Sequence, residues 1–199
     1  ITKDSERYID EWIDYNFALG FHSIYLYDTS HELTMNEWVK KLHSNGRQNL
    51  YFHHANIIQK AGTQSEMYAE CAKTYGKKHT YLAFFDDDEF LVLKKHSDVV
   101  SMLHDHLPNG SLMINWQIFG TSGHTHYEPI PVTKRFVYRH KETSRRKKSI
   151  VKVCDLVSPD VHCHEIKEGT WHYDTDGERK VTCAPRKNRP SDVAVLHHY

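Results

Sequence analysis

The sequence lacks a hydrophobic run long enough to cross a membrane and has no excess of either charge. Its 199 residues include 26 Lys and Arg and 26 Asp and Glu, so the formal net charge is zero. Proteins that bind nucleic acid or an anionic membrane usually carry one-sided charge, so we expect neither partner. No secretory leader is visible, and the chain opens with Ile1 rather than Met. We therefore expect a domain cut from a longer chain, with further domains beside it.

Cysteine is scarce as well. The chain has four cysteines, none in a CxxC pair, at Cys71, Cys154, Cys163 and Cys183. A disulfide framework is not expected in a chain of this length, so we predict reduced thiols. An alternative is a zinc-stabilised binding module, built from Cys154, His162, Cys163, His164 and Cys183. Irregular spacing argues against it, because adjacent ligands on one strand point to opposite faces.

Alternating helix and strand patterns fill the first half of the chain. Apolar spacing and capping residues predict helices over 4–20, 34–46, 63–76 and 97–108, with Asp4-Ser5 as the cap of the first and Ser97 as the cap of the last. Runs of β-branched and aromatic residues predict strands over 22–27, 50–53, 80–85 and 111–116, with another over 150–154. Such alternation is typical of an α/β fold with a mostly parallel central sheet and helices on both faces. With no repeat and no second hydrophobic core in view, we predict one domain over residues 1–199.

Four consecutive carboxylates, Asp86 to Glu89, follow the strand predicted over 80–85. Like charges in a row repel one another unless a cation or solvent compensates them. A short acidic motif is more often a surface turn, but apolar residues flank this one on both sides, which favours a metal site. On an extended backbone Asp86 and Asp88 point the same way. They could then share a Mg²⁺ or Mn²⁺ ion, which completes its shell with phosphate and water.

The chain resembles glycosyltransferases of the GT-A fold, and more narrowly those of families 2 and 92. Matching stretches run through the whole sequence, at 8–20 (YIDEWIDYNFALG), 24–28 (IYLYD), 85–91 (FDDDEFL), 115–123 (NWQIFGTSG) and 197–199 (HHY). The resemblance implies a GT-A fold with a nucleotide-binding half, 1–116, and an acceptor-side half, 117–199. It implies transfer, with inversion, from a nucleotide-diphosphate sugar to a glycan or glycoprotein, with Mn²⁺ or Mg²⁺ as cofactor and a UDP-sugar as the favoured donor.

The resemblance also assigns roles to individual residues. Asp86 and Asp88 match the metal-binding acids, and Asp87 would approach the ribose. His198 matches a histidine that ligates the metal or contacts phosphate.

Other matched residues concern the nucleotide. Thr2 and Lys3 would line its pocket, Asp28 at a strand end would accept a hydrogen bond from the base, and Gln64 matches a glutamine on the helix before the acidic motif. Asp28 and Asp86 both end predicted strands, and ligands bind at that edge of such sheets.

An inverting transfer needs a base that takes the proton of the acceptor hydroxyl. The candidates are Asp155, Asp160 and Glu165, and we choose Asp155 although the sequence does not decide among them. Trp116 and Tyr127 could stack on a sugar ring, but a place in the core is commoner for Trp116. The basic run over 141–148 is interpreted as a solvated face.

Other activities also fit the acidic motif. A metal-dependent nucleotidyltransferase or phosphohydrolase needs hard cations on carboxylates as well, and a non-catalytic relic would bind the donor without using it. A weaker resemblance, to glycosyltransferases of large algal viruses, implies a cytoplasmic location, in the host cell if the protein is viral.

Overall fold

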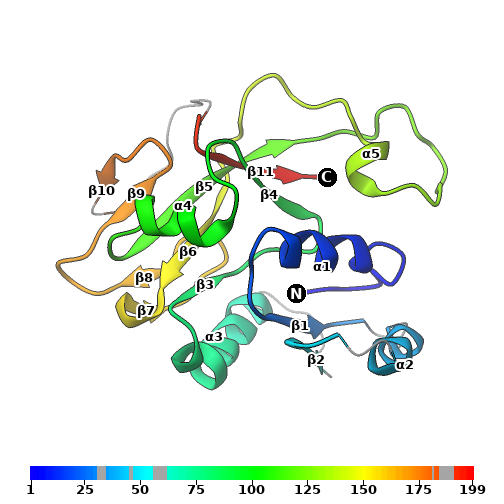
Figure 1. Cartoon of the computed structure of the whole chain (residues 1–199), viewed down its shortest axis with the longest axis horizontal. Coiled ribbons are helices and arrows are strands. Elements are labelled where there is room, and N and C mark those ends of the chain that lie inside the picture. Colours follow the sequence, from blue (N-terminus) through cyan, green and yellow to red (C-terminus); the bar gives the residue numbers. More distant parts are fainter. Residues whose placement is uncertain (31–34, 45–46, 56–61, 181, 184–190) are drawn as a thin grey trace.

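The computed structural model describes residues 1–199 except 31–34, 45–46, 56–61, 181 and 184–190 (Figure 1). Its helices are α1 (Ile9–Ala18), α2 (Asn36–Ser44), α3 (Thr63–Tyr75), α4 (Val99–His106) and α5 (Val132–Arg135), with 3₁₀ turns at Gly76–Lys78 and Val153–Asp155. Within the described ranges, no helix combines the length and the apolar character that crossing a membrane requires.

The strands confirm the α/β class. They are β1 (Ile24–Asp28), β2 (Leu50–His54), β3 (Tyr81–Ala83), β4 (Glu89–Leu93), β5 (Ser111–Ile118), β6 (Lys147–Lys152), β7 (Leu156–Ser158), β8 (Glu165–Ile166), β9 (His172–Asp174), β10 (Arg179–Lys180) and β11 (Ala194–His198). Strands β1 and β2 pair in parallel, and Thr2 extends them through a parallel bridge to Asp28. Strands β7 and β8 form a separate antiparallel pair.

The main sheet has seven strands and is mixed rather than mostly parallel. Strand β5 is parallel to β9 and β11, whereas β6 runs antiparallel to both β3 and β5, and β11 runs antiparallel to β4. The predicted parallel sheet therefore holds for β1 and β2 but not for β3. The alternation of helices and strands in the first half of the chain could not show that β6 and β11, which come from the second half, insert into the main sheet.

Helix α1 lies between the small β1–β2 sheet and the main sheet (Figure 1). Its inner face is bonded to β4, because the Trp12 indole N–H donates to Glu89 O at 2.8 Å and the Tyr15 hydroxyl donates to Leu91 O at 2.8 Å. Trp12 belongs to the apolar face predicted for this helix, together with Tyr8, Ile9, Ile13 and Phe17, whereas Tyr15 was not predicted to be part of it. The sequence did not predict β4 itself, since its apolar residues directly follow the acidic run.

The predicted helices are present, but their first residues differ from the expected caps. Tyr8 rather than Ser5 precedes α1, and the Ser5 hydroxyl is used elsewhere. At α4 the cap is Asp98 rather than Ser97, and its carboxylate accepts from Ser101 N–H at 2.8 Å. Gly20 ends the first helix at φ +100°, as predicted. Thr34 and Gly46, expected at the two ends of the second helix, lie outside the described residues.

The prediction of reduced thiols is wrong for one pair of cysteines. Cys163 and Cys183 form a disulfide across a sequence separation of 20, whereas Cys71 and Cys154 are free. The zinc set proposed from sequence does not assemble either, because Cys154 is exposed at the far end of β6. Instead, His172 of β9 lies beside the disulfide, and its Nδ1 is 3.4 Å from Cys183 Sγ. Sequence spacing could not show which distant segments meet.

His164 is a buried histidine whose hydrogen bonds require the neutral ring. Its Nδ1 accepts from Asp160 N–H at 3.1 Å, so Nε2 carries the hydrogen and donates to Ser149 O at 3.2 Å. Burial lowers the pKa of His164 from 6.5 to about 4. The unfolded chain therefore binds this proton at a higher pH than the folded chain does.

We predict that the folded state loses stability as the pH falls from about 6.5 to about 4, the interval between the unfolded and folded pKa values of His164. The shift corresponds to about 3 kcal/mol at most. In urea unfolding at pH 7 and pH 4, His164→Gln should reduce the difference in unfolding free energy by that order. His126→Gln, an exposed control, should leave it unchanged. An equal pH dependence in wild type and His164→Gln would contradict this assignment.

Candidate functional site

A cleft of about 680 Å³ opens beside the turn that joins β3 to β4. Predicted site residues line it from three segments, namely Thr2, Lys3, Gln64, Asp86, Asp87 and Asp88. Asp28 lies next to the cleft, because Thr2 bridges to it and Thr29 is part of the wall. The structure thus brings together residues that are far apart in sequence.

The acidic run forms a turn, so the prediction of an extended backbone is wrong. Asp87 and Asp88 are turn residues, and Glu89 N–H donates to Asp86 O at 3.1 Å. A turn reverses the chain between β3 and β4, and its successive side chains no longer alternate between two faces. The three aspartates therefore face three different sets of partners.

Asp86 is held by protein donors on both carboxylate oxygens. Its Oδ1 accepts from Gln64 Nε2 at 2.7 Å and from the Tyr68 hydroxyl at 3.3 Å. Its Oδ2 pairs with Lys148 Nζ at 2.9 Å. That Asp86 and Asp88 share one cation stays a prediction, and the contacts distinguish the two acids clearly.

Lys148 is the residue that the sequence interpretation placed wrongly. It belongs to the basic run taken as a solvated face, yet its side chain is 0% exposed. Strand β6 begins at Lys147 rather than near Ile150, and its pairing with β3 carries Lys148 under the acidic turn. The apolar residues that follow Lys148 could have signalled a strand starting earlier, but not which acids it would meet.

Glu89 lies beside the same lysine and is fully buried. Its Oε2 accepts from Asp86 N–H at 2.9 Å and lies 3.9 Å from Lys148 Nζ. Burial raises the pKa of Glu89 to about 9, although the charge of Lys148 opposes the shift. Glu89 therefore keeps its proton at neutral pH, and Lys148 is left to compensate Asp86.

Asp87 turns toward the N-terminal segment. Its Oδ2 accepts from the Thr2 hydroxyl at 2.7 Å and also from the Ser5 hydroxyl. Sequence reasoning assigned Ser5 to a helix cap and so missed this contact.

Asp28, the predicted partner of the base, is completely buried. Its Oδ1 accepts from Ser30 N–H at 2.9 Å and from the Ser30 hydroxyl at 2.5 Å, and its Oδ2 lies 3.1 Å from His54 Nδ1. These contacts fix the end of β1 beside Thr2. Contact between Asp28 and a nucleotide base stays a prediction.

Asp88 faces His198, the penultimate residue of the sequence. His198 Nε2 lies 3.8 Å from Asp88 Oδ2, and Asp88 Oδ1 is buried with no hydrogen-bond partner among the described residues. Burial raises the pKa of Asp88, while the neighbouring His198 acts in the opposite direction. A buried carboxylate oxygen without a donor, next to an imidazole nitrogen, fits the ligand preferences of a divalent cation such as Mn²⁺.

The three candidate bases lie in different places. Asp155 follows the far end of β6, on the order of 20 Å along the strand from Lys148, and its Oδ2 accepts from Gly110 N–H at 2.7 Å. Glu165 is exposed on β8. Asp160 is exposed and directly precedes Val161, which lines the cleft. Of the three candidates, only Asp160 has a chain neighbour that lines the cleft, and which of them acts as the base stays a prediction.

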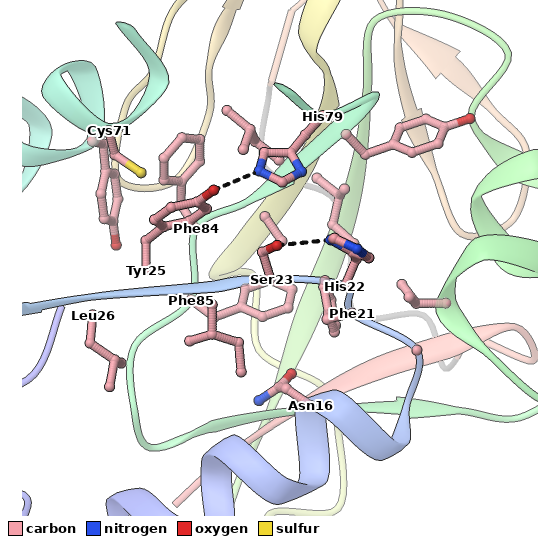
Figure 2. A pocket seen from close by; sticks show the side chains of 18 of the residues that line it. Asn16, Phe21, His22, Ser23, Tyr25, Leu26, Cys71, His79, Phe84 and Phe85 are labelled. Atoms are coloured by element: carbon pink, nitrogen blue, oxygen red, sulfur yellow. Dashed lines mark hydrogen bonds between the residues drawn. The ribbon is translucent and has the colours of Figure 1, made fainter. Parts of the chain in front are cut away.

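A second cavity, of about 230 Å³, lies between β1 and β3 and has a mostly apolar lining. Figure 2 shows Leu26, Phe84 and Phe85 around it, and the Tyr25 hydroxyl bonded to His79 Nε2 at 2.8 Å across it. Its one acidic lining residue is Asp87, which bonds Thr2 instead. The chemistry of the acidic turn therefore belongs to the larger, polar cleft.

Comparisons with known proteins identify the family of this chain. The sequence profile of glycosyltransferase family 92 matches residues 3–199. A glycosyltransferase family 92 protein of rice, Oryza sativa subsp. japonica, is 27% identical over 178 residues. The match covers 85% of this chain and 29% of the rice protein, so the chain spans less than a third of that relative.

We predict that Lys148→Met lowers the free energy of unfolding at pH 7 by about 3 kcal/mol, because it leaves the charge of Asp86 without its buried counter-ion. Lys152→Met is the matched control on the same strand. Its Nζ donates to Pro108 O at the surface, and its loss should cost about 1 kcal/mol or less. Urea unfolding followed by tryptophan fluorescence measures both, and equal losses would show that Lys148 carries no special electrostatic role.

Proposed function

Because the chain belongs to glycosyltransferase family 92, an enzyme family, we propose that it is a metal-dependent catalytic domain. It transfers a sugar from a nucleotide-diphosphate donor to a glycan or glycoprotein acceptor. The observation that carries this proposal is Asp88 at the polar cleft, whose buried Oδ1 has no hydrogen-bond partner among the described residues and whose Oδ2 lies 3.8 Å from His198 Nε2. A GT-A fold, one domain over 1–199 and the division into halves 1–116 and 117–199 are part of the proposal.

The cleft suits a nucleotide-diphosphate sugar. Its volume, about 680 Å³, lies within the usual range for small-molecule sites. Thr2 and Lys3 form one wall and Gln64 forms another. The exposed ammonium of Lys3 is a cation for the diphosphate. The preference for UDP comes from the family resemblance rather than from a contact.

Asp88 and His198 are the residues that would hold a Mn²⁺ or Mg²⁺ ion. When bound there, the ion neutralises charge that develops on the leaving diphosphate and orients it. Asp86 lines the cleft, but Lys148, Gln64 and Tyr68 already hold its carboxylate. Asp87 can approach a ribose only if its hydrogen bonds with Thr2 and Ser5 are broken.

The acceptor side lies in the second half of the chain. An inverting transfer needs a carboxylate on the face of the sugar opposite the leaving group. We assign this role to Asp160, since Val161 beside it lines the cleft and its carboxylate is exposed. Asp155, the candidate favoured from the sequence, instead accepts a hydrogen bond from Gly110 N–H at the other end of β6.

A longer protein that contains residues 1–199 and further domains is part of the proposal. The rice relative is more than three times longer than the matched region, which supports further domains outside residues 1–199. The acceptor and any partner proteins would then depend on those domains as well as on this cleft.

We predict that UDP binds the wild-type chain in calorimetry only when Mn²⁺ is present, and that Asp88→Ala and His198→Ala each weaken this binding at least about tenfold. Asp155→Asn, remote from the cleft, is the control and should bind as wild type does. Absence of binding for UDP and other nucleoside diphosphates with Mn²⁺ would contradict the proposal. Release of phosphate or pyrophosphate, instead of a nucleoside diphosphate, would favour the phosphohydrolase or nucleotidyltransferase alternatives.

We further predict that Asp160→Asn lowers kcat by about a hundredfold or more while Mn²⁺-dependent binding of UDP stays unchanged. A base acts on the acceptor hydroxyl and not on the donor, so turnover and donor binding should separate. Turnover is measured as release of UDP from the donor that calorimetry selects. A larger loss in Asp155→Asn than in Asp160→Asn would return the role to Asp155.

A further inference from the structure

The indole of Trp116 stacks on the imidazole of His198. The ring centroids are 4.3 Å apart and the planes meet at 29°. Trp116 belongs to β5 and His198 to β11, and the parallel register places His198 opposite Ile118. Trp116 stands two residues before Ile118, so its side chain and that of His198 project from the same face of the sheet as diagonal neighbours.

The surroundings of Trp116 show that ring contacts determine its position. The side chain is 6% exposed, with the His162 ring edge-on at 5.6 Å and the Arg146 guanidinium over the indole at 5.9 Å. The indole N–H is buried and has no hydrogen-bond partner among the described residues. A buried tryptophan usually satisfies this group. Here the plane of the ring, and not its polar atom, meets the neighbours.

The backbone of His198 is already fixed by its two neighbouring strands. It pairs with Glu89 of β4 on one side and with Ile118 of β5 on the other. In addition, Phe119 N–H donates to His198 O at 2.9 Å, and Tyr199 N–H donates to Asp88 O at 3.1 Å. Only the side-chain torsions of His198 remain to be set, and a histidine side chain has several staggered rotamers.

We propose that Trp116 is a positioning residue, which selects the rotamer of His198 that directs Nε2 toward Asp88. This inference rests on the proposed function, in which Asp88 and His198 hold the divalent cation. Groups that orient a metal-binding histidine typically change metal affinity by 10–100-fold when they are removed. The flat aromatic face is the property that matters, because a branched aliphatic side chain fills space without fixing the angle of a ring.

The experiment measures the affinity of the 199-residue chain for Mn²⁺ by electron paramagnetic resonance, without nucleotide. Trp116→Leu should weaken binding about tenfold or more, and Trp116→Phe, which keeps an aromatic face, should recover most of it. Trp38→Leu is the matched control, because Trp38 is buried on α2 and packs on Phe52 of β2. It should leave Mn²⁺ affinity unchanged even if it lowers thermal stability.

A double variant separates positioning from a general loss of structure. If Trp116 acts through His198, then Trp116→Leu should have no further effect on Mn²⁺ affinity in a His198→Ala background. Additive losses would overturn the inference, as would equal affinities of wild type and Trp116→Leu. Wild-type protein that binds no Mn²⁺ would instead overturn the proposed cation site itself.

A readout in the metal-free protein covers the case in which Trp116→Leu fails to fold. Stacking on an indole shifts the His198 Hε1 proton upfield in the NMR spectrum, and His198→Ala assigns that signal. The shift should persist, reduced, in Trp116→Phe. An unshifted His198 signal in folded wild-type protein would overturn the positioning role and leave the proposed function intact.

Discussion

The acidic run from Asp86 to Glu89 imposes the main constraint on this structure, because Glu89 is buried, the three aspartates are partly buried, and each of these four neighbouring carboxyl groups has to be compensated separately. The fully buried Lys148 pairs with Asp86 at 2.9 Å. Glu89 needs no counter-charge because it keeps its proton at neutral pH, since burial raises its pKa to about 9. Asp87 receives two hydroxyl donors, and Asp88 meets the His198 ring. The reversal of the chain at this point distributes the charges among these partners.

The mixed sheet follows from the same constraint. Lys148 reaches Asp86 because β6 runs antiparallel between β3 and β5. His198 reaches Asp88 because β11 lies between β4 and β5. Both strands come from the second half of the chain, and Thr2 and Ser5 come from its first residues. The partners of the acidic turn therefore come from distant parts of the chain, and the strand order that looks irregular brings Lys148 and His198 to it.

The aspartates differ in how many protein donors their carboxylate oxygens receive, and this difference favours Asp88 as the ligand of a cation. Asp86 is saturated by protein donors, whereas Asp88 retains a buried oxygen without a donor among the described residues. An ion held at Asp88 would complete that coordination, and the stacked Trp116 would limit the freedom of the second ligand, His198. The resemblance seen in the sequence implies metal binding at this turn, and the buried Asp88 oxygen without a donor among the described residues supports the same proposal.

Local sequence patterns determined the helices of the first half, its strands except β4, the α/β class and the acidic motif after β3. The family resemblance added Thr2, Gln64 and His198, which the structure places around that motif. The tertiary structure alone decided that the motif is a turn, that β4 follows it, that Lys148 is buried beneath it, that Asp155 binds Gly110 at the far end of β6, and that Cys163 meets Cys183. The reason is physical. Periodicity and capping record the preferences of near neighbours along the chain, whereas the burial of a charge or a thiol pair depends on which distant segments become neighbours when the sheet forms.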